Sequence, residues 1–361
     1  MNLSLIWLNL VFSNNYSTIL SLLNELNLAE VFNLPIKTWK EFDIQNETLE
    51  KLESTKLKDS ATEVLNFCNN NNIKIVNIFD SYYPINLKNI QNPPTILYYL
   101  GELSSIDECS ISVVGSRNYT EYGRIATEKL VAELAKNKVT IVSGMARGID
   151  TYAHTTALNN NARTIAILGS GINVIYPKEN TELYNKIIKN GAVISEFLPN
   201  TKPYAWNFPT RNRLISGISQ GTLLIEASLK SGTMTTANWA SDQGKNVYCV
   251  PGNIFSEQSK GTNKLISEGA KIVTSAIDIL EDLHQTIQLE LTSYETPNLD
   301  KEEKLIFDAI NAHPTSIYEI SLKTNLPINK LNTFLTLLEL NGYIRKLSGN
   351  NFIKDSKYIN L

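Results

Sequence analysis

The order of short apolar segments and helical segments along this chain predicts an α/β protein built on a parallel β-sheet that is covered by helices on both faces. The short segments between Ser110 and Leu283 are nearly all apolar, as strands buried on both faces are. A helical region precedes them, and three helical segments with a terminal hairpin, the outline of a winged helix, follow them. The predicted parts are a small helical N-terminal domain, the core, a linker and a C-terminal winged-helix domain, at residues 1–70, 71–284, 285–298 and 299–361.

The composition is that of a soluble globular protein with more than one domain. The chain has 361 residues, of which 42% are hydrophobic and 19% are charged, with a formal net charge of -3. These values favour two or three folded units and argue against disorder. Because the chain as a whole is not basic, any nucleic-acid site must be a local patch.

Three cysteines and the N-terminal segment indicate the compartment. Cys68, Cys109 and Cys249 lie far apart without paired spacing, which argues against a disulfide framework or a zinc site and fits a reducing cytoplasm. The N-terminal segment MNLSLIWLNLVF is apolar but is interrupted by polar residues, and no Lys or Arg precedes Lys37. We therefore predict a cytoplasmic protein without a signal peptide or a membrane span.

The first part of the chain is predicted to be helical. From Ser17 to about Leu65 apolar residues recur at helical spacing, with polar breaks between short helices. From Ile73 to Leu100 the pattern changes to short extended runs joined by a segment with paired prolines, which places a domain boundary before this region.

The core segments alternate between strand-like and helix-like patterns. The main predicted helices span Glu121–Lys136 and Met234–Gln243. Ligands of such sheets bind at the carboxyl ends of the strands. The predicted strands are 111–114, 139–143, 164–168, 192–195, 222–227 and 246–250.

Glycine-rich loops follow four of these strands. Glycine lets the backbone turn tightly and bring N–H groups close to an anion, and the next helix adds partial positive charge. Short loops between strands and helices also need glycine without any ligand, and the cations inside these loops favour the phosphate interpretation. The predicted loop residues are Gly115, Ser116 and Arg117; Gly144 and Arg147; Gly169 and Ser170; and Lys230, Ser231, Gly232 and Thr233.

A cation-rich, aromatic segment, KPYAWNFPTRNRLISG, spans Lys202–Gly217 and contains no acid; none occurs between Glu196 and Glu226. Its cations would create a local positive field, and its aromatic rings can either pack into the core or stack on unpaired bases. The residues that we single out are the cations Lys202, Arg211 and Arg213, their neighbour Asn212, and the rings Tyr204, Trp206 and Phe208.

The C-terminal part is predicted to begin with a helix over Leu299–Ala312. Ser316 and Glu319 have the spacing of a capping box, and Pro327 begins a third helix that ends at Gly342. Lys330 is the one cation of that third helix, so protein contact is as well supported as base readout.

Enzymatic alternatives remain open. The dinucleotide fingerprint is absent, since Val174 occupies the position of the third glycine after Gly169 and Gly171. A phosphoribohydrolase-like, nucleotide-cleaving enzyme would need an acid after its glycine loop, whereas Glu226 precedes LKSGT. Asp150 and His154 lie four residues apart on one helix face and can be a catalytic pair or a surface hydrogen bond. We predict a protein that is not an enzyme and has no cofactor or metal.

Six ordered motifs carry a resemblance. The segments VVGSR, SGMARGIDTYAH, AILGSGINVIYP, FPTRNRLISG, EASLKSGTMTTA and VYCVPG resemble the DNA-processing protein A (DprA/Smf) family over roughly Ile73–Leu283.

The resemblance implies an extended Rossmann-like core that forms a homodimer, binds single-stranded DNA and loads a RecA-type recombinase on incoming strands during natural transformation. It also implies DNA contacts at Arg117, near Lys202 and Phe208, and at the arginines of the RNR motif.

Overall fold

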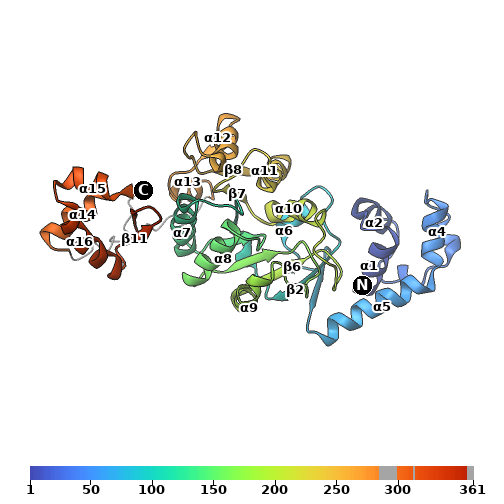
Figure 1. Cartoon of the computed structure of the whole chain (residues 1–361). Helices are drawn as coiled ribbons and strands as arrows, with labels where there is room; N and C mark the ends of the chain where they lie inside the picture. The colour runs from blue at the N-terminus through green and yellow to red at the C-terminus, as the bar shows by residue number, and fades with distance from the viewer. Residues whose placement is uncertain (284–298, 312–313, 356–361) are drawn as a thin grey trace.

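The computed structural model describes residues 1–283, 299–311 and 314–355, and its centre is a nine-stranded mixed sheet (Figure 1). The strand order is β1-β2-β6-β5-β4-β3-β7-β8-β9. Neighbours from β6 to β9 are parallel, whereas β1 and β2 add an antiparallel edge. The strands are β1 (Lys74–Asn77), β2 (Ile96–Gly101), β3 (Ser110–Val114), β4 (Thr140–Ser143), β5 (Thr164–Ile167), β6 (Gly191–Ser195), β7 (Gly221–Leu224), β8 (Asn246–Cys249) and β9 (Lys271–Ile272).

Helices cover both faces of this sheet, which explains why its strands are nearly all apolar. In β5, Ile165 and Ile167 pack into a core under α6, α10 and α11, while Ala166 between them packs on the opposite face. This alternation follows from the two-residue period of a strand, and it confirms the predicted fold class. The covering helices are α6 (Ile85–Lys88), α7 (Glu121–Lys136), α8 (Ile149–Asn159), α9 (Thr181–Asn190), α10 (Asn207–Ile218), α11 (Gly232–Asp242), α12 (Lys260–Ser267) and α13 (Ile277–Leu280).

The N-terminal helices share a hydrophobic core with one face of the sheet. The core around Leu5 and Leu8 of α1 continues to Tyr98 of β2 and Val193 of β6. The first helix begins at Asn2, whereas the sequence predicted a helical region only from Ser17 onward. The helices are α1 (Asn2–Val11), α2 (Tyr16–Leu23), α3 (Ile36–Trp39), α4 (Asn46–Glu53) and α5 (Thr55–Asn70).

Short 3₁₀ turns connect several of these elements. Among the described residues, no helix is both long enough and apolar enough to cross a bilayer. The turns are η1 (Val31–Asn33), η2 (Ser105–Glu108), η3 (Lys178–Asn180) and η4 (Glu257–Ser259).

The C-terminal part has the predicted winged-helix outline. Ser316 begins the second helix, where its side chain accepts a hydrogen bond from the Glu319 N–H at 3.2 Å. The predicted linker, residues 285–298, lies outside the described residues. The elements are α14 (Lys301–Ala309), β10 (Thr315–Ser316), α15 (Ile317–Thr324), α16 (Ile328–Leu340), β11 (Ile344–Leu347) and β12 (Asn351–Lys354), with strand order β10-β12-β11.

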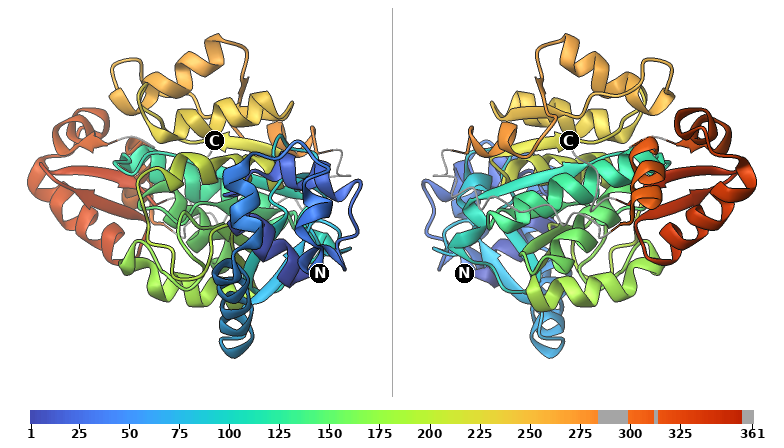
Figure 2. Two further views of the ribbon diagram at one scale, coloured as in Figure 1. Left: turned by 90° about the vertical axis from the view of Figure 1, so that its right-hand side faces the viewer. Right: turned by 90° about the vertical axis from the view of Figure 1, so that its left-hand side faces the viewer.

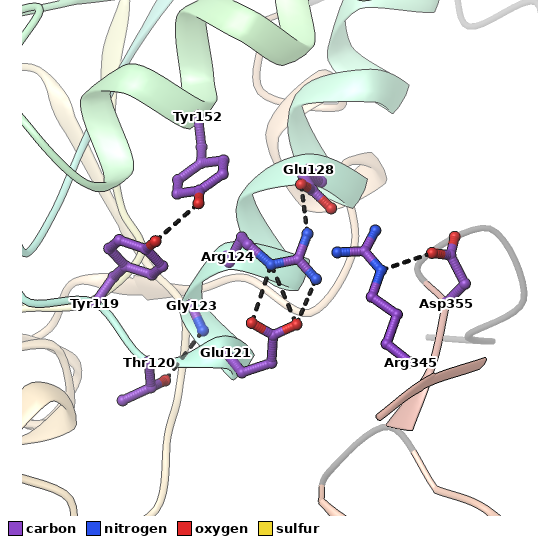
Figure 3. A network of polar contacts seen from close by, with 9 residues as sticks. All are labelled: Tyr119, Thr120, Glu121, Gly123, Arg124, Glu128, Tyr152, Arg345 and Asp355. Carbon is purple, nitrogen blue, oxygen red and sulfur yellow. Dashed lines mark hydrogen bonds and ion pairs between the residues drawn. The ribbon is translucent and has the colours of Figure 1, made fainter. Parts of the chain in front are cut away.

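The hairpin of the winged helix packs against α7 (Figure 2). Ile353 and Leu347 contact Ile125 there. Figure 3 shows the polar groups beside this contact: Arg124 joins Glu121 and Glu128 within α7, and Arg345 pairs with Asp355 within the hairpin at 2.9 Å. The dashed polar pairs in that view stay within their own domains.

Candidate nucleic-acid interface

An open cavity of about 580 Å³ lies at the carboxyl ends of β3 and β7. The strand order reverses at this place, because β4 lies on one side of β3 and β7 on the other. Ligands of open α/β sheets bind at such switch points. The predicted site residues that line the cavity are Gly115, Ser116, Arg117, Phe208, Arg211, Asn212, Ser231, Gly232 and Thr233. A smaller hollow of about 430 Å³, beside Tyr82 and Glu108, contains none of the predicted residues.

The loop after β3 is built so that Arg117 reaches solvent. A Cβ on Gly115 would come within 2.8 Å of the Ile149 Cβ, so a larger residue would displace α8. Ser116 is buried and donates a hydrogen bond to Gln258 at 2.7 Å. Arg117 is exposed, and within residues 1–283 it has no ion-pair partner. An unpaired guanidinium on a fixed loop is suited to a phosphate group.

The Phe208 ring lies beside two guanidinium groups. Its centroid is 5.8 Å from the Cζ of Arg117 and 5.8 Å from that of Arg211. Gly169 makes room for the ring, since a Cβ there would be 2.7 Å from Phe208 Cδ1. Tyr176 lies on the same side of the cavity, with its ring centroid 5.6 Å from that of Phe208. The cavity thus combines positive charge with flat aromatic surface.

Arg211 forms the charged floor of the cavity. It is 3% exposed and donates to the carbonyl oxygens of Gly144, at 3.0 Å, and Ile167. Burial lowers the pKa of Arg211 to about 10, so the guanidinium stays charged at neutral pH. A side chain at Gly144 would lie 2.9 Å from both Arg211 and Asp150, which explains the glycine.

Asp150 is the acid of this cavity. It accepts hydrogen bonds from the N–H groups of Gly144, at 3.2 Å, and Ala146, at 3.3 Å. Burial raises its pKa to about 6, against the opposing effect of Arg211 and these N–H groups. The proton that this carboxyl gains near pH 6 removes a negative charge from a cavity that we expect to bind anions.

We therefore expect the affinity of this cavity for an anionic ligand, such as the phosphates of a nucleic-acid strand, to rise as the pH falls through about 6. Asp150→Asn should bind more tightly than the parent at pH 7.5 and should lose the pH dependence, which a binding titration at pH 5 to 8 measures. If binding raises the pKa of Asp150 by one further unit, the gain is about tenfold. His154 cannot account for such a profile, because burial lowers its pKa to about 3. A profile that persists in Asp150→Asn contradicts this assignment.

Protonation of Asp150 is expected to favour folding as well as anion binding. The folded-state pKa of Asp150 lies above its ordinary value of 3.8, so the folded protein binds a proton more tightly than the unfolded chain. On account of this group alone, the free energy of unfolding is highest below about pH 4 and falls as the pH rises to about 6.

The loop after β7 brings the N-terminus of α11 to the cavity. The Ser231 Oγ is buried and has no hydrogen-bond partner in the described ranges. Gly232 has open space around its Cα, and its carbonyl oxygen accepts from the Asn212 side chain at 3.3 Å. Free N–H groups at a helix start favour an anion. Glu226 is held elsewhere, since it accepts from the Thr120 N–H at 2.8 Å.

Several predicted residues do not line the cavity. Arg147 is exposed but pairs with Glu179, with 2.8 Å between its Nη2 and the Glu179 Oε2. Gly169 is covered by Phe208, and Ser170 is buried, donating to the Val174 carbonyl at 2.7 Å. Lys202 and Lys230 are exposed outside the lining.

The structure corrects the prediction for Arg213. Its guanidinium is buried and forms an ion pair with Glu196, whose carboxylate also accepts a hydrogen bond from the Tyr16 hydroxyl at 3.0 Å. Arg213 therefore joins α10 to the N-terminal helices and is not available to phosphate. The two arginines of the motif are two residues apart on α10, and such positions do not share a helix face.

Asp150 and His154 also differ from both predictions made for them. Both side chains are buried, so they form no surface hydrogen bond. Nor do they pair for catalysis, because Asp150 accepts from backbone N–H groups and His154 Nδ1 lies 2.7 Å from the Thr164 hydroxyl.

Several residues of the cavity lining were not among the site residues predicted from the sequence, and three of them carry polar or aromatic side chains that a ligand can contact. Tyr176, Asn118 and Gln258 all line the cavity. Tyr176 follows the third glycine loop closely, which is the one local signal that could have identified it. Gln258 comes from a distant loop and reaches Ser116, which no local pattern indicates.

Comparisons with known proteins show which families the core and the winged helix match. Residues 74–284 match the family described as DNA recombination-mediator protein A, and residues 292–350 match the DprA winged helix domain. A curated relative, DNA processing protein DprA of Streptococcus pneumoniae, is 41% identical over 205 residues, which cover 57% of this chain and 72% of the relative.

Two solved structures are also similar. The X-ray structure of DNA processing protein A from Streptococcus pneumoniae matches with a TM-score of 0.58 and 33% identity, covering 70% of this chain and 93% of that one. The DNA processing protein A of Helicobacter pylori, solved for its single-stranded DNA binding mode, matches with a TM-score of 0.53 and 30% identity, covering 58% of this chain and 95% of that one. The core and the winged helix thus follow each other as two matched domains, and the chain belongs to the DNA recombination-mediator protein A (DprA/Smf) family.

Proposed function

We propose that this protein binds single-stranded DNA in the cavity at the β3 and β7 ends, and holds the strand by its phosphates without reading its sequence. The observation that carries the proposal is the exposed guanidinium of Arg117, which lies beside the Phe208 ring and has no ion-pair partner among the described residues. A cation and a flat ring at one place suit a phosphate and the adjacent unpaired base. The α11 N-terminus supplies further donors.

The wider role that we propose is recombination mediation. Family membership supports a function in DNA processing and recombination. Loading of a RecA-type recombinase on incoming strands during natural transformation, in a competent cell, is the part of the proposal that rests on the resemblance. The three cysteines of the chain form no disulfide with one another, which supports a cytoplasmic location.

We also propose that the protein acts as a homodimer through its core. Large apolar side chains are exposed near the β8 and β9 end of the sheet, where β9 is an edge strand. Exposed apolar groups of this kind favour burial against a partner. They are Ile254, Phe255, Ile272 and Ile277.

A nucleotide-cleaving enzyme is the second candidate, and Asp150 is the observation that favours it. A buried carboxyl with a raised pKa in a cavity is typical of catalytic sites. The hydrogen bonds that Asp150 Oδ2 accepts from two backbone N–H groups instead support a structural role for this carboxyl. Glu226, the other acid considered for catalysis, accepts a hydrogen bond from the Thr120 hydroxyl, which supports a structural role for it as well. Turnover of nucleoside monophosphates by the purified protein, lost in Asp150→Asn, would establish the enzyme; we expect no turnover.

The direct test is a binding titration with single-stranded and duplex DNA of equal length, repeated with Arg117→Ala over a range of salt. We expect preferential binding of the single strand. Removing one phosphate contact releases about one counterion fewer, so the slope of log affinity against log salt should fall by about 0.7. The loss should be the same for every base sequence, because phosphate contacts carry no sequence information.

Lys330→Ala is the matched control. Lys330 is half-exposed on the winged helix and pairs with Glu302 at 2.6 Å, so its removal should change neither the affinity nor the slope. Equal weakening by the two substitutions, or an unchanged slope in Arg117→Ala, would contradict the proposed contact.

A further inference from the structure

Two exposed aromatic rings stand just outside the cavity and have no role in the site described so far. The ring centroids of Tyr204 and Trp206 are 4.6 Å apart and their planes differ by 4°, so the rings are stacked. Trp206 is 68% exposed and Tyr204 is 43% exposed. Such apolar surface is costly to leave in water unless it has a partner.

The backbone holds this pair in place. The neighbouring residues Pro203 and Ala205 line the cavity, whereas Tyr204 and Trp206 do not belong to its lining. Asn207 is buried and fixes the segment, since its N–H donates to the Tyr204 carbonyl at 3.0 Å and its side chain donates to that of Lys202 at 3.3 Å. The rings are therefore preorganised and do not have to be ordered when a ligand binds.

Charge and position indicate the occupant. The segment borders the cavity at Ala205, and Lys202 beside it is exposed without an ion-pair partner among residues 1–283. One face of the Trp206 ring is covered by Tyr204, and its large exposure leaves the outer face open. A flat, open indole on the same short segment as an exposed cation is the kind of surface on which an unpaired base stacks.

We propose that the Tyr204–Trp206 pair is a second base-stacking site, on which the strand rests where it leaves the cavity. The inference rests on the proposed binding of single-stranded DNA. It extends the site outward from Phe208, which lies inside the cavity. It also gives the protein an internal reporter, because stacking on a base quenches tryptophan emission.

The experiment follows tryptophan emission and the anisotropy of a labelled single-stranded oligonucleotide in the same titration. Trp7 and Trp39 are 1% exposed and should not respond. We expect binding to quench the emission of the parent and of Trp239→Phe, the matched control, and the quench to disappear in Trp206→Phe. Trp206→Ala should weaken binding by about fivefold to 150-fold, the range of one lost stacking contact.

An abasic oligonucleotide of the same length should bind through its phosphates without quenching. Four results overturn the inference while leaving the proposed function intact: binding without a quench, unchanged affinity in Trp206→Ala, a quench by the abasic strand, or an equal quench by duplex DNA. Absence of any change in anisotropy contradicts the proposed function itself. Circular dichroism of Trp206→Ala should match the parent, because the exposed ring supports no core contact.

Discussion

Arg213→Ala is expected to lower the free energy of unfolding by about 3 to 5 kcal/mol, the cost of leaving one member of a buried ion pair alone. The Glu196 carboxylate would remain in a site where it is 6% exposed and where the Tyr16 hydroxyl is its other partner. Burial raises the pKa of Glu196, so protonation can relieve the loss, and the effect should shrink toward low pH. Urea unfolding at pH 5 and pH 8 measures both.

The control replaces both partners. Arg213→Met combined with Glu196→Gln should recover most of the lost stability, because no buried charge is left alone and the amide oxygen still accepts the hydrogen bond of the Tyr16 hydroxyl. The salt slope of DNA binding should be that of the parent in the double variant, since Arg213 faces α2 rather than solvent. A reduced slope would restore Arg213 as a phosphate contact.

Phe208→Ala is expected to weaken binding of single-stranded DNA by about 1 to 3 kcal/mol, the contribution of one stacking ring. The slope of log affinity against log salt should stay as in the parent, because no charge is removed. The unchanged slope distinguishes the effect of Phe208→Ala from that of Arg117→Ala, which should lower the slope. Anisotropy titrations at several salt concentrations measure both quantities.

Phe208→Tyr serves as the control, because it keeps a flat ring and should bind nearly as the parent does. Duplex DNA should be affected much less by Phe208→Ala, since its bases are already stacked on one another. If the single strand and the duplex lose affinity equally, or if the salt slope falls, the ring acts through the position of the adjacent arginines instead.

Local patterns were sufficient for most of the core. The predicted helix Glu121–Lys136 agrees with α7 because an N-cap, Thr120, and an apolar stripe mark it in the sequence. Strands buried on both faces are continuous apolar runs, so the parallel strands were readable, with their ends within a few residues. By contrast α1 was missed, because a helix buried nearly all round has no amphipathic period to detect.

The sequence predicted which loops at the ends of the strands form the site, but not which of their side chains line it. The loops after β3 and β7 follow from the rule for parallel sheets, and they do line the cavity. The pairing of Arg147 with Glu179 and of Arg213 with Glu196 joins residues far apart in the chain, which residue spacing cannot reveal. The RNR motif predicts local positive charge, but only the orientation of α10 determines that Arg211, and not Arg213, lines the cavity.

The shared core of the N-terminal helices and the sheet constrains how the protein folds during synthesis. Residues 1–70 leave the ribosome before β6 does, yet their core includes Val193 of that strand. At about 5 to 20 residues per second, the missing partner arrives roughly 6 to 25 s later. Until then the apolar surface of α1, which includes Leu5 and Leu8, has no sheet to cover it. The nascent chain is therefore expected to need chaperone protection over this interval, and slower translation after residue 70 should increase aggregation.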